Sequence, residues 1–495
     1  MMRCTRPARP LVLPVLLALA ACTVGPDYRR PRPEEPTHWT GGGDVTAPEA
    51  GARANPAFIR WWTQFNDPEL DRLVQSALKD NLDVQIAAAR IAEARAQRDV
   101  VAGAALPTVA AKGQSTRYRL PDSITRLPGE VLAPAAATNP ALPASIRIPQ
   151  YVSLFQVGFD SSWELDLFGG TRRAIQAANA STEAAVAARR GVLVSILAEI
   201  GNDYVTLRAT QQRILAAQRT LAAEQLLLEL TQSRHVSGLA SDLDVEQAEA
   251  RLETWRAALP DLQARQMQSI HALAVLTSRL PEDLEARLSE PQAVPPTPPS
   301  IPVELPSELL ESRPDIQQAE RTLASATAAV GQAEAQRFPS LSLTAGTSLI
   351  STQLNQLLHR DNWSWNVGGS LTAPIFEGGR LAASERAAEA VAQQSALQYR
   401  RTVLQAFSEV EDSLRNYTAA TDRLAALQTA ARADQVALDR AAQLYRAGLG
   451  SYIDVLDADR TVASADDELA LGQQAQASGL VAVYKALGGG WQTAP

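Results

Sequence analysis

The sequence of 495 residues is poor in the side chains on which metal sites, disulfides and nucleic-acid binding depend. Its two cysteines, Cys4 and Cys22, both lie near the N-terminus, and its four histidines stand far apart. A Cys/His metal site and a structural disulfide are therefore not expected. The net charge is −8 and Lys and Arg form no cluster, so nucleic acid is not an expected partner either.

Catalytic motifs are also missing. Only three lysines occur, Lys79, Lys112 and Lys485, and none belongs to a Gly-x-x-x-x-Gly-Lys phosphate loop. The Gly-x-Ser-x-Gly elbow of serine hydrolases is absent. Acidic pairs such as Asp466–Asp467 are expected on solvated helix faces, not in a pocket. The sequence thus predicts a protein that is not an enzyme and that has no cofactor.

Aromatic residues make up only 5% of the chain, although 46% of its residues are hydrophobic. So few bulky side chains favour long, thin helical packing over a large globular core. After the N-terminus there is no run of about 20 apolar residues, so no transmembrane helix is expected.

The N-terminus has the pattern of a secretory signal. Arg3, Arg6 and Arg9 precede a short apolar stretch over residues 11–21, which ends in the sequence LAAC at Cys22. This ending resembles a bacterial lipobox, which implies that residues 1–21 are a signal peptide and that Cys22 carries lipid. The alternative is an ordinary signal peptide with a chance cysteine. Thr23 follows Cys22, whereas an aspartate there would suggest retention in the inner membrane.

Proline-free stretches over residues 150–259 and 375–494 indicate where long helices can run. Each stretch has apolar residues at alternating steps of four and three, the period of coiled-coil packing. The first seam consists of Leu193, Leu197, Ile200, Tyr204, Leu207, Gln211 and Ile214. The second consists of Val403, Phe407, Val410, Leu414, Tyr417, Thr421 and Leu424. We expect helices over about 172–235 and 380–446, each roughly 100 Å long, in a coiled-coil rod or a helical tube.

Both long helices end in the same motif. Residues 238–245 (GLASDLDV) reappear as residues 448–455 (GLGSYIDV). A glycine suits the left-handed position after a helix, and a serine followed three residues later by an acid suits the start of the next helix. The chain is therefore predicted to be an internal duplication with one helical hairpin in each half.

Strand-like segments occupy matching places in the two halves, over residues 108–119 and 150–166, then 341–350 and 363–376. Long loops over about 120–149 and 351–362 join each pair, as on the extracellular side of an outer-membrane barrel. Four strands cannot close a barrel, and open sheet edges are not tolerated in lipid. Several chains would therefore have to combine.

Several motifs, in the right order, resemble the TolC-like outer-membrane factor family, and most closely its NodT-type efflux lipoproteins. They are residues 22–28 (CTVGPDY), 61–70 (WWTQFNDPEL), 163–169 (WELDLFG), 312–316 (SRPDI), 337–339 (RFP) and 445–458. Each motif alone would be weak evidence. Together they cover essentially all of the chain after Cys22.

The resemblance implies a mainly helical homotrimer in which four strands per chain form one twelve-stranded outer-membrane barrel and long helices form a tube across the periplasm. An equatorial domain would surround the tube. The expected divisions are a lipid-anchored segment 22–66, a first repeat 67–277, a proline-rich equatorial connector 278–312, a second repeat 313–487 and a tail 488–495.

The implied role is that of a passive exit duct of a tripartite efflux pump for drugs or other small molecules. Its partners would be a periplasmic adaptor, an inner-membrane pump of the proton-driven RND type and outer-membrane lipid. Two alternatives remain open. One is a duct for type I protein secretion, and the other is a lipid-anchored periplasmic coiled-coil scaffold that conducts nothing.

The resemblance also places a periplasmic gate at Tyr445, Asp454 and Asp457, where rings of acids would favour cations. Asp454 also follows Ser451 at the spacing of a helix cap, so its role is either gate and cap or cap alone. Asp457 is assigned to the gate against the alternative of a solvated helix face. Asp244 is expected to be a cap, with a bond to Tyr445 in the closed state. Gly450 stands where some relatives carry a basic residue, so no basic partner is assigned.

The exposed tips are expected to meet the adaptor, in addition to turning the chain. They comprise Gly238, Leu239, Ser241, Gly448, Leu449 and Ser451. Trp61 and Trp62 are expected to pack into the equatorial belt, because they precede a helix and not a strand; the alternative is an aromatic pair at the membrane interface.

Overall fold

The computed structural model describes residues 23–34, 36, 39–40, 46–48, 56–121, 149–298, 301–303 and 306–493. The expected signal peptide, Cys22 and most of the loop over 120–149 lie outside the described residues. The chain divides into two compact units. The first comprises Met1–Tyr28, Ala96–Asn179 and Ala324–Ala392, and the second comprises Arg29–Arg95, Ala180–Leu323 and Gln393–Pro495. Each unit draws on both predicted repeats, and the division into repeats stays a prediction.

The elements follow one another from α2 to η6, with the short β1 (Thr46–Pro48) before them. The first half contains α2 (Pro56–Ile59), η3 (Trp61–Phe65), α3 (Pro68–Asp80), α4 (Leu82–Gly103), β2 (Thr108–Arg119), β3 (Tyr151–Leu165), α7 (Gly170–Val236) and α8 (Asp242–Leu276). The second half contains α9 (Pro281–Leu288), β4 (Ile301–Val303), α10 (Pro306–Ser312), α11 (Pro314–Ala335), β5 (Ser340–Ser351), η4 (Leu354–Gln356), η5 (Arg360–Asn362), β6 (Trp363–Thr372), α12 (Arg380–Arg446), α13 (Tyr452–Ala486) and η6 (Trp491–Thr493). None of the helices within the described residues is long and apolar enough to cross a membrane.

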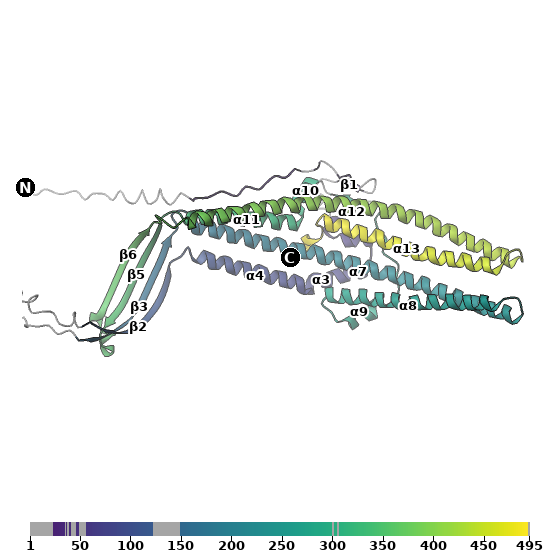
Figure 1. Cartoon of the computed structure of the whole chain (residues 1–495), viewed down its shortest axis with the longest axis horizontal. Coiled ribbons are helices and arrows are strands. Elements are labelled where there is room, and N and C mark those ends of the chain that lie inside the picture. Colours follow the sequence, from purple (N-terminus) through teal and green to yellow (C-terminus); the bar gives the residue numbers. More distant parts are fainter. Residues whose placement is uncertain are drawn as a thin grey trace, which may run out of the picture. The chain divides into compact units, whose positions relative to one another are not determined.

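The long helices of the two halves have equal lengths. Helices α7 and α12 have 67 residues each, and α8 and α13 have 35 residues each. Figure 1 shows α8 running back beside α7, and α13 beside α12. At 1.5 Å per residue the two longer helices measure roughly 100 Å. These equal lengths support the duplication that the repeated tip motif predicts.

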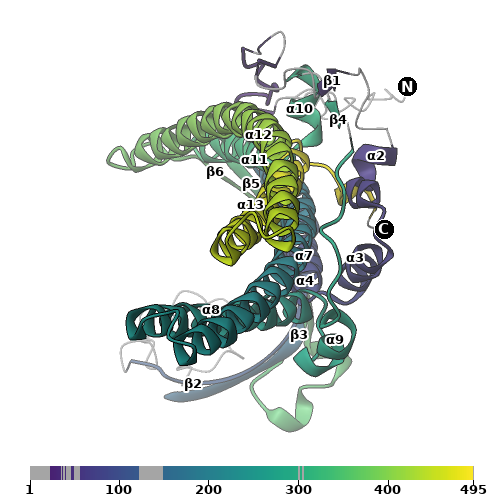
Figure 2. The same ribbon diagram turned by 90° about the vertical axis from the view of Figure 1, so that its right-hand side faces the viewer.

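The predicted seams are the buried stripes of these helices. All seven residues of the α7 seam are buried, and six of the seven on α12 are buried, the exception being the half-buried Thr421. Figure 2 shows α8, α7, α13 and α12 following one another along a curve, so α7 has a neighbour on each side. The steps of four and three residues thus keep each seam against its neighbours.

Helix α8 continues through Pro260. Proline removes one backbone donor from a helix and usually ends or kinks it. Pro260 is exposed, and Leu252 and Leu262 on either side of it are buried against α7. Packing of the helix therefore outweighs the loss of one hydrogen bond.

The first unit contains a four-stranded antiparallel sheet in the order β2-β3-β5-β6. The bounds of β2, β3 and β5 agree with those expected from the sequence to within one residue at each end. Strand β6 instead ends at Thr372, four residues before the expected end. Pro374 follows, and a proline cannot donate to a strand ladder.

The register gives the sheet one apolar and one mainly polar face. Residues that are paired across neighbouring strands point to the same face of the sheet. Every such pair joins two odd-numbered or two even-numbered residues, so one face is odd and the other is even. The odd face carries exposed apolar side chains, including Val109, Phe159, Trp163, Leu343, Trp365, Val367 and Leu371. The even face carries Lys112, Gln114, Asp160, Thr344 and Asn366, with Lys112 3.9 Å from Asp160. Such alternation suits strands with lipid on one side and water on the other.

An aromatic cluster fills the second unit beside α7. It consists of the buried side chains of Phe58, Trp61, Trp62, Phe65 and Tyr484. The rings of Trp61 and Tyr484 stack with centroids 5.7 Å apart. Trp61 and Trp62 are therefore buried within this cluster, and their place in an equatorial belt stays a prediction.

Gly201 lets α7 approach this cluster closely. A Cβ atom at this position would lie 2.9 Å from the Trp61 ring and 3.0 Å from a Val481 methyl group. Gly191, ten residues earlier on the same helix, has room: a Cβ there would meet only Pro314, at 3.9 Å.

We predict opposite effects of the two Gly→Ala substitutions. Gly191→Ala should stabilise the protein by about 0.5–1 kcal/mol, since alanine is the better helix former. Gly201→Ala should destabilise it by about 1–3 kcal/mol, since the methyl group overpacks the aromatic cluster. Thermal unfolding in detergent, followed by circular dichroism, measures both. Equal stability of the two variants would contradict the close approach at Gly201.

Candidate functional site

Both hairpin tips are built by the same local chemistry. Gly238 and Gly448 have φ of 69° and 72°, in the left-handed region that favours glycine. The next amide, of Leu239 or Leu449, donates to the carbonyl of Arg234 at 2.8 Å or of Leu444 at 2.9 Å. These bonds belong to the Schellman motif, which satisfies carbonyls at a helix end and reverses the chain. The sequence-predicted turns are therefore present in both halves.

The tips expose apolar side chains. Leu239 is 71% exposed and Leu449 is 78% exposed, and Val236 and Ile453 beside them are exposed too. Burying these side chains against a partner would release their apolar surface from water. The tip leucines thus have the exposure that a docking role requires.

Asp244 and Asp454 are both helix caps. The Asp244 carboxylate accepts from the Ser241 amide at 2.8 Å, and the Asp454 carboxylate accepts from the Ser451 amide at 3.0 Å. Both helix starts form complete capping boxes. The hydrogen bonds from the backbone and hydroxyl of Ser241 lower the pKa of Asp244, so this acid is ionised at neutral pH.

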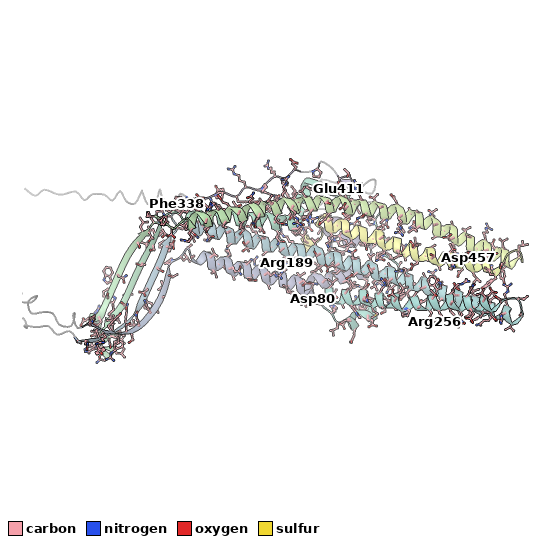
Figure 3. All side chains as sticks on the ribbon, viewed as in Figure 1. Asp80, Arg189, Arg256, Phe338, Glu411 and Asp457 are labelled. Atoms are coloured by element: carbon pink, nitrogen blue, oxygen red, sulfur yellow. The ribbon has the colours of Figure 1, made fainter. Side chains whose placement is uncertain are left out.

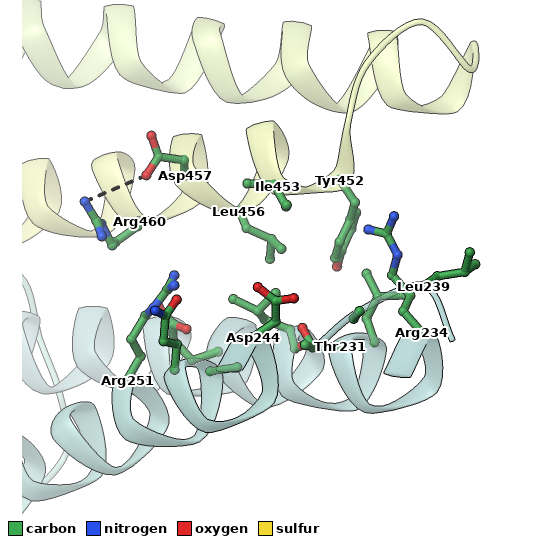
Figure 4. A pocket seen from close by; sticks show the side chains of 16 residues that line it. Thr231, Arg234, Leu239, Asp244, Arg251, Tyr452, Ile453, Leu456, Asp457 and Arg460 are labelled. Atoms are coloured by element: carbon green, nitrogen blue, oxygen red, sulfur yellow. Dashed lines mark hydrogen bonds and ion pairs between the residues drawn. The ribbon is translucent and has the colours of Figure 1, made fainter. Parts of the chain in front are cut away.

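Asp457 is not involved in capping. Its side chain is 72% exposed, and its carboxylate lies 3.7 Å from Arg460, one turn further along α13 (Figure 4). Figure 3 shows Asp457 on α13 toward the tip of the hairpin. Tyr445 packs its ring against Tyr452 across the turn, with centroids 5.0 Å apart. The spacing of three residues between Asp457 and Arg460 is a helix ion-pair signal that sequence reasoning missed.

A cavity of about 240 Å³ separates the two hairpins next to the tips. Figure 4 shows Asp244 and Arg251 on one side of it, and Tyr452, Leu456 and Asp457 on the other. Its other lining residues include Glu224, Leu227, Arg234, Leu239 and Arg460. Three of the expected site residues therefore share one cavity, Leu239, Asp244 and Asp457. Glu224, Arg251 and Arg460 come from three separate helices, α7, α8 and α13, so sequence spacing alone does not bring them together.

Glu224 is the buried acid of this cavity wall. It is 6% exposed, and one of its carboxylate oxygens has no hydrogen-bond partner within the described structure. Burial raises the pKa of Glu224 above its ordinary value, although Arg251 and Arg460 act in the opposite direction. The charged form of Glu224 is therefore unfavourable for the packing of the hairpins.

Closer to the aromatic cluster, α7 and α13 are joined by polar contacts. Arg213 binds Asp467 at 2.7 Å, and Arg219 binds Asp466 at 3.1 Å. The expectation that this acidic pair lies on a solvated face was wrong, because both acids are partly covered and paired with α7. Sequence reasoning missed these pairs, since their partners lie about 250 residues apart.

Comparison with known proteins places these features in a family. The profile of the family described as outer membrane efflux protein matches residues 73–279 and 305–489. The chain belongs to the outer membrane efflux protein family. It is 31% identical over 476 residues to the probable efflux pump outer membrane protein TtgC of Pseudomonas putida, which covers 96% of this chain and 93% of TtgC.

Other members of the family are similar over most of the chain. Nodulation protein T of Rhizobium leguminosarum bv. viciae is 32% identical, over 81% of this chain and 77% of its own length. The solved structure of the outer-membrane channel OprN superposes with a TM-score of 0.80 at 33% identity, over 95% of this chain and 100% of OprN. The resemblance to NodT-type outer-membrane factors is thus confirmed.

Membership of this family indicates what each face of the sheet contacts. The protein has the fold of the trimeric outer-membrane efflux channels, in which four strands per chain contribute to a shared twelve-stranded barrel. It lies in the outer membrane, with its helical part in the periplasm. The apolar odd face therefore meets lipid, and the even face with Lys112 and Asp160 lines the channel. The family consists of channels for efflux.

We predict that Glu224→Gln stabilises the hairpins at neutral pH. The pKa of Glu224 is raised by burial, so the folded protein loses stability when this carboxyl group ionises at a pH above the raised pKa. At a pH below the ordinary carboxyl pKa the group is protonated in both the folded and the unfolded state, and the loss disappears. The variant should melt about 1 °C higher at pH 7.5, roughly the effect of 1 kcal/mol in a chain of 495 residues, and no higher at pH 4. Melting curves at both pH values measure the effect.

Glu229→Gln is the matched control. Glu229 lies on the same helix, is exposed and accepts a hydrogen bond from Gln225. Its substitution should leave the melting temperature unchanged at both pH values. An equal gain in the two variants would show that burial of Glu224 is not the cause.

Proposed function

We propose that this protein is the passive exit duct of a tripartite efflux pump that exports drugs or other small molecules. A periplasmic adaptor and an inner-membrane pump of the proton-driven RND type would deliver the substrate. The observation that carries the proposal is a sheet with one lipid-facing and one polar face, continued by helices of 67 residues. The name of the efflux relative TtgC supports the same role.

The two alternatives are supported less well. A scaffold that conducts nothing needs no sheet, whereas this chain has four strands with a polar face suited to water. A duct for type I protein secretion would share the fold, but TtgC, which is 31% identical over 96% of this chain, is named as an efflux pump protein. Lipid attachment at Cys22 remains part of the proposal.

The absence of the phosphate-loop and serine-hydrolase motifs from the sequence supports transport without catalysis by this chain. The free energy for transport would therefore come from the pump.

We assign the periplasmic gate to Tyr445, Asp454, Asp457 and Asp244. Asp454 and Asp244 hold the tip turns in shape, while the exposed Asp457 would present one carboxylate per protomer to the entrance. Three carboxylates around a trimer axis attract cations and repel one another. Arg460 beside each Asp457 would limit this repulsion.

We predict that Asp457→Asn reduces the preference of the channel for cations and raises its conductance. The substitution removes three negative charges per trimer without touching a cap, so folding should be unaffected. Single-channel recordings in planar bilayers measure both quantities.

Asp261→Asn is the matched control for the gate. Asp261 is an exposed acid of the first hairpin that also pairs with an arginine one turn on, at 2.8 Å from Arg265. It should keep the wild-type conductance and selectivity. Wild-type behaviour of Asp457→Asn as well would place Asp457 on an ordinary helix face.

We further assign adaptor docking to the tips, with Gly238, Ser241, Gly448 and Ser451 shaping the turns that present the leucines. Leu239→Glu or Leu449→Glu should weaken crosslinking to the adaptor severalfold, because a charge replaces an exposed apolar side chain. Trimers should still form. Leu226→Glu, at an exposed leucine away from the tips, should crosslink normally. Unchanged crosslinking in the tip variants would remove these leucines from the docking surface.

A further inference from the structure

The first described residues of the chain, Thr23–Asp27, are bound to the place where the sheet joins the helices. The Val24 amide donates to the Phe168 carbonyl at 3.1 Å, in the short link between β3 and α7. Arg173, in the first turn of α7, donates to the carbonyls of Val24 at 3.0 Å and Gly25 at 2.9 Å. The same guanidinium binds Asp27 at 2.9 Å.

The side chain of Arg173 is buried at this junction. It is 4% exposed, and a buried arginine must be paired and hydrogen-bonded to be tolerated. Its fourth partner is Gln176, one turn further along α7, at 3.0 Å. Three of its four partners thus belong to the N-terminal segment, so loss of that segment would leave a buried guanidinium short of acceptors.

Glycines make the close contact possible. Gly25 has φ of 88°, and a Cβ on it would collide with the backbone of Gly331 in α11. A Cβ on Gly331 would lie 2.9 Å from Nε of Arg173. A Cβ on Gly169, which has φ of 85°, would lie 2.5 Å from the Thr23 methyl group. The segment therefore fits one position on this junction, and larger residues at these three places would displace it.

The junction lies at the periplasmic end of the strands. Phe168 stacks on Phe338 with ring centroids 4.8 Å apart, and Figure 3 shows Phe338 where the strands meet the long helices. Aromatic rings are enriched where membrane meets water. Cys22 is the residue directly before Thr23, so lipid on Cys22 would start one residue from this clamped site.

We propose that Arg173 is the positioning residue of an N-terminal clamp that fixes the lipidated Cys22 at the periplasmic rim of the barrel. This inference rests on the proposed lipid anchor at Cys22 and deepens it. Chain termini are usually poorly ordered unless they are tied down. A clamped anchor holds its acyl chains beside a fixed part of the sheet, whereas a free tether would let them explore the surrounding membrane.

The experiment uses the full-length protein with Pro26→Cys, which introduces a thiol at an exposed position of the segment. A nitroxide label on this thiol reports motion on the nanosecond scale. In the otherwise wild-type protein the label should be immobilised. Arg173→Met should shorten its rotational correlation time severalfold, while heat-stable trimers and palmitate labelling persist. Asp27→Asn, at a side chain that is 86% exposed, removes a single contact and should give a smaller effect in the same direction.

Arg172→Met is the matched control, since Arg172 pairs with Asp166 of the preceding link at 3.2 Å. It should leave the label immobile. Gly25→Val tests the clamp without altering Arg173, and it should mobilise the label by colliding with Gly331. An immobile label in both Arg173→Met and Gly25→Val would overturn the clamp.

Palmitate labelling separates the clamp from the anchor. Cys22→Ser should abolish palmitate incorporation, and Arg173→Met should not. Incorporation that persists in Cys22→Ser would refute the lipid anchor, and with it the proposed role of the clamp in placing lipid. The label on residue 26 would still decide whether the segment is held by Arg173.

Discussion

Burial of the seam on α7 between Leu193 and Ile214 is the constraint on which the second unit depends. A 67-residue helix has little stability of its own in water and gains most of it by packing an apolar face. The seam is narrow, so it needs neighbours on both sides, which α8 and α13 provide. The aromatic cluster around Trp61 packs against the same helix and adds buried surface at about 25 cal/mol per Å².

The contact between α7 and α13 changes character along its length. At Gly201 it is apolar and tight, at Arg213 and Arg219 it consists of ion pairs, and near Glu224 it opens into the cavity of about 240 Å³. Close-packed interfaces resist displacement, whereas polar contacts with water nearby can rearrange. The tips, to which we assign adaptor docking, thus lie beside a cavity, whereas the same pair of helices is close-packed at Gly201.

Most of the fold could be predicted from the sequence, because it follows from short-range patterns. The seam steps, the repeated Gly-Leu-x-Ser turns and the paired strand segments are all local. The contacts of the candidate site could not be predicted, because they join residues far apart in the sequence. Arg213 and Asp467 lie in different repeats, and Glu224 meets Arg460 only once the hairpins are packed. The strand pattern also placed the end of β6 beyond Pro374, whereas the strand ends at Thr372.

The odd and even numbering of the sheet faces constrains how this gene can change in length. Removing one residue within a strand would turn the following side chains to the opposite face, so that charged groups such as Asp160 would enter lipid. A homotrimer would carry that error three times around the barrel. Strands of this family should therefore vary by substitution, or by losing and gaining residues in pairs. Length changes of one residue should be confined to the connections between strands.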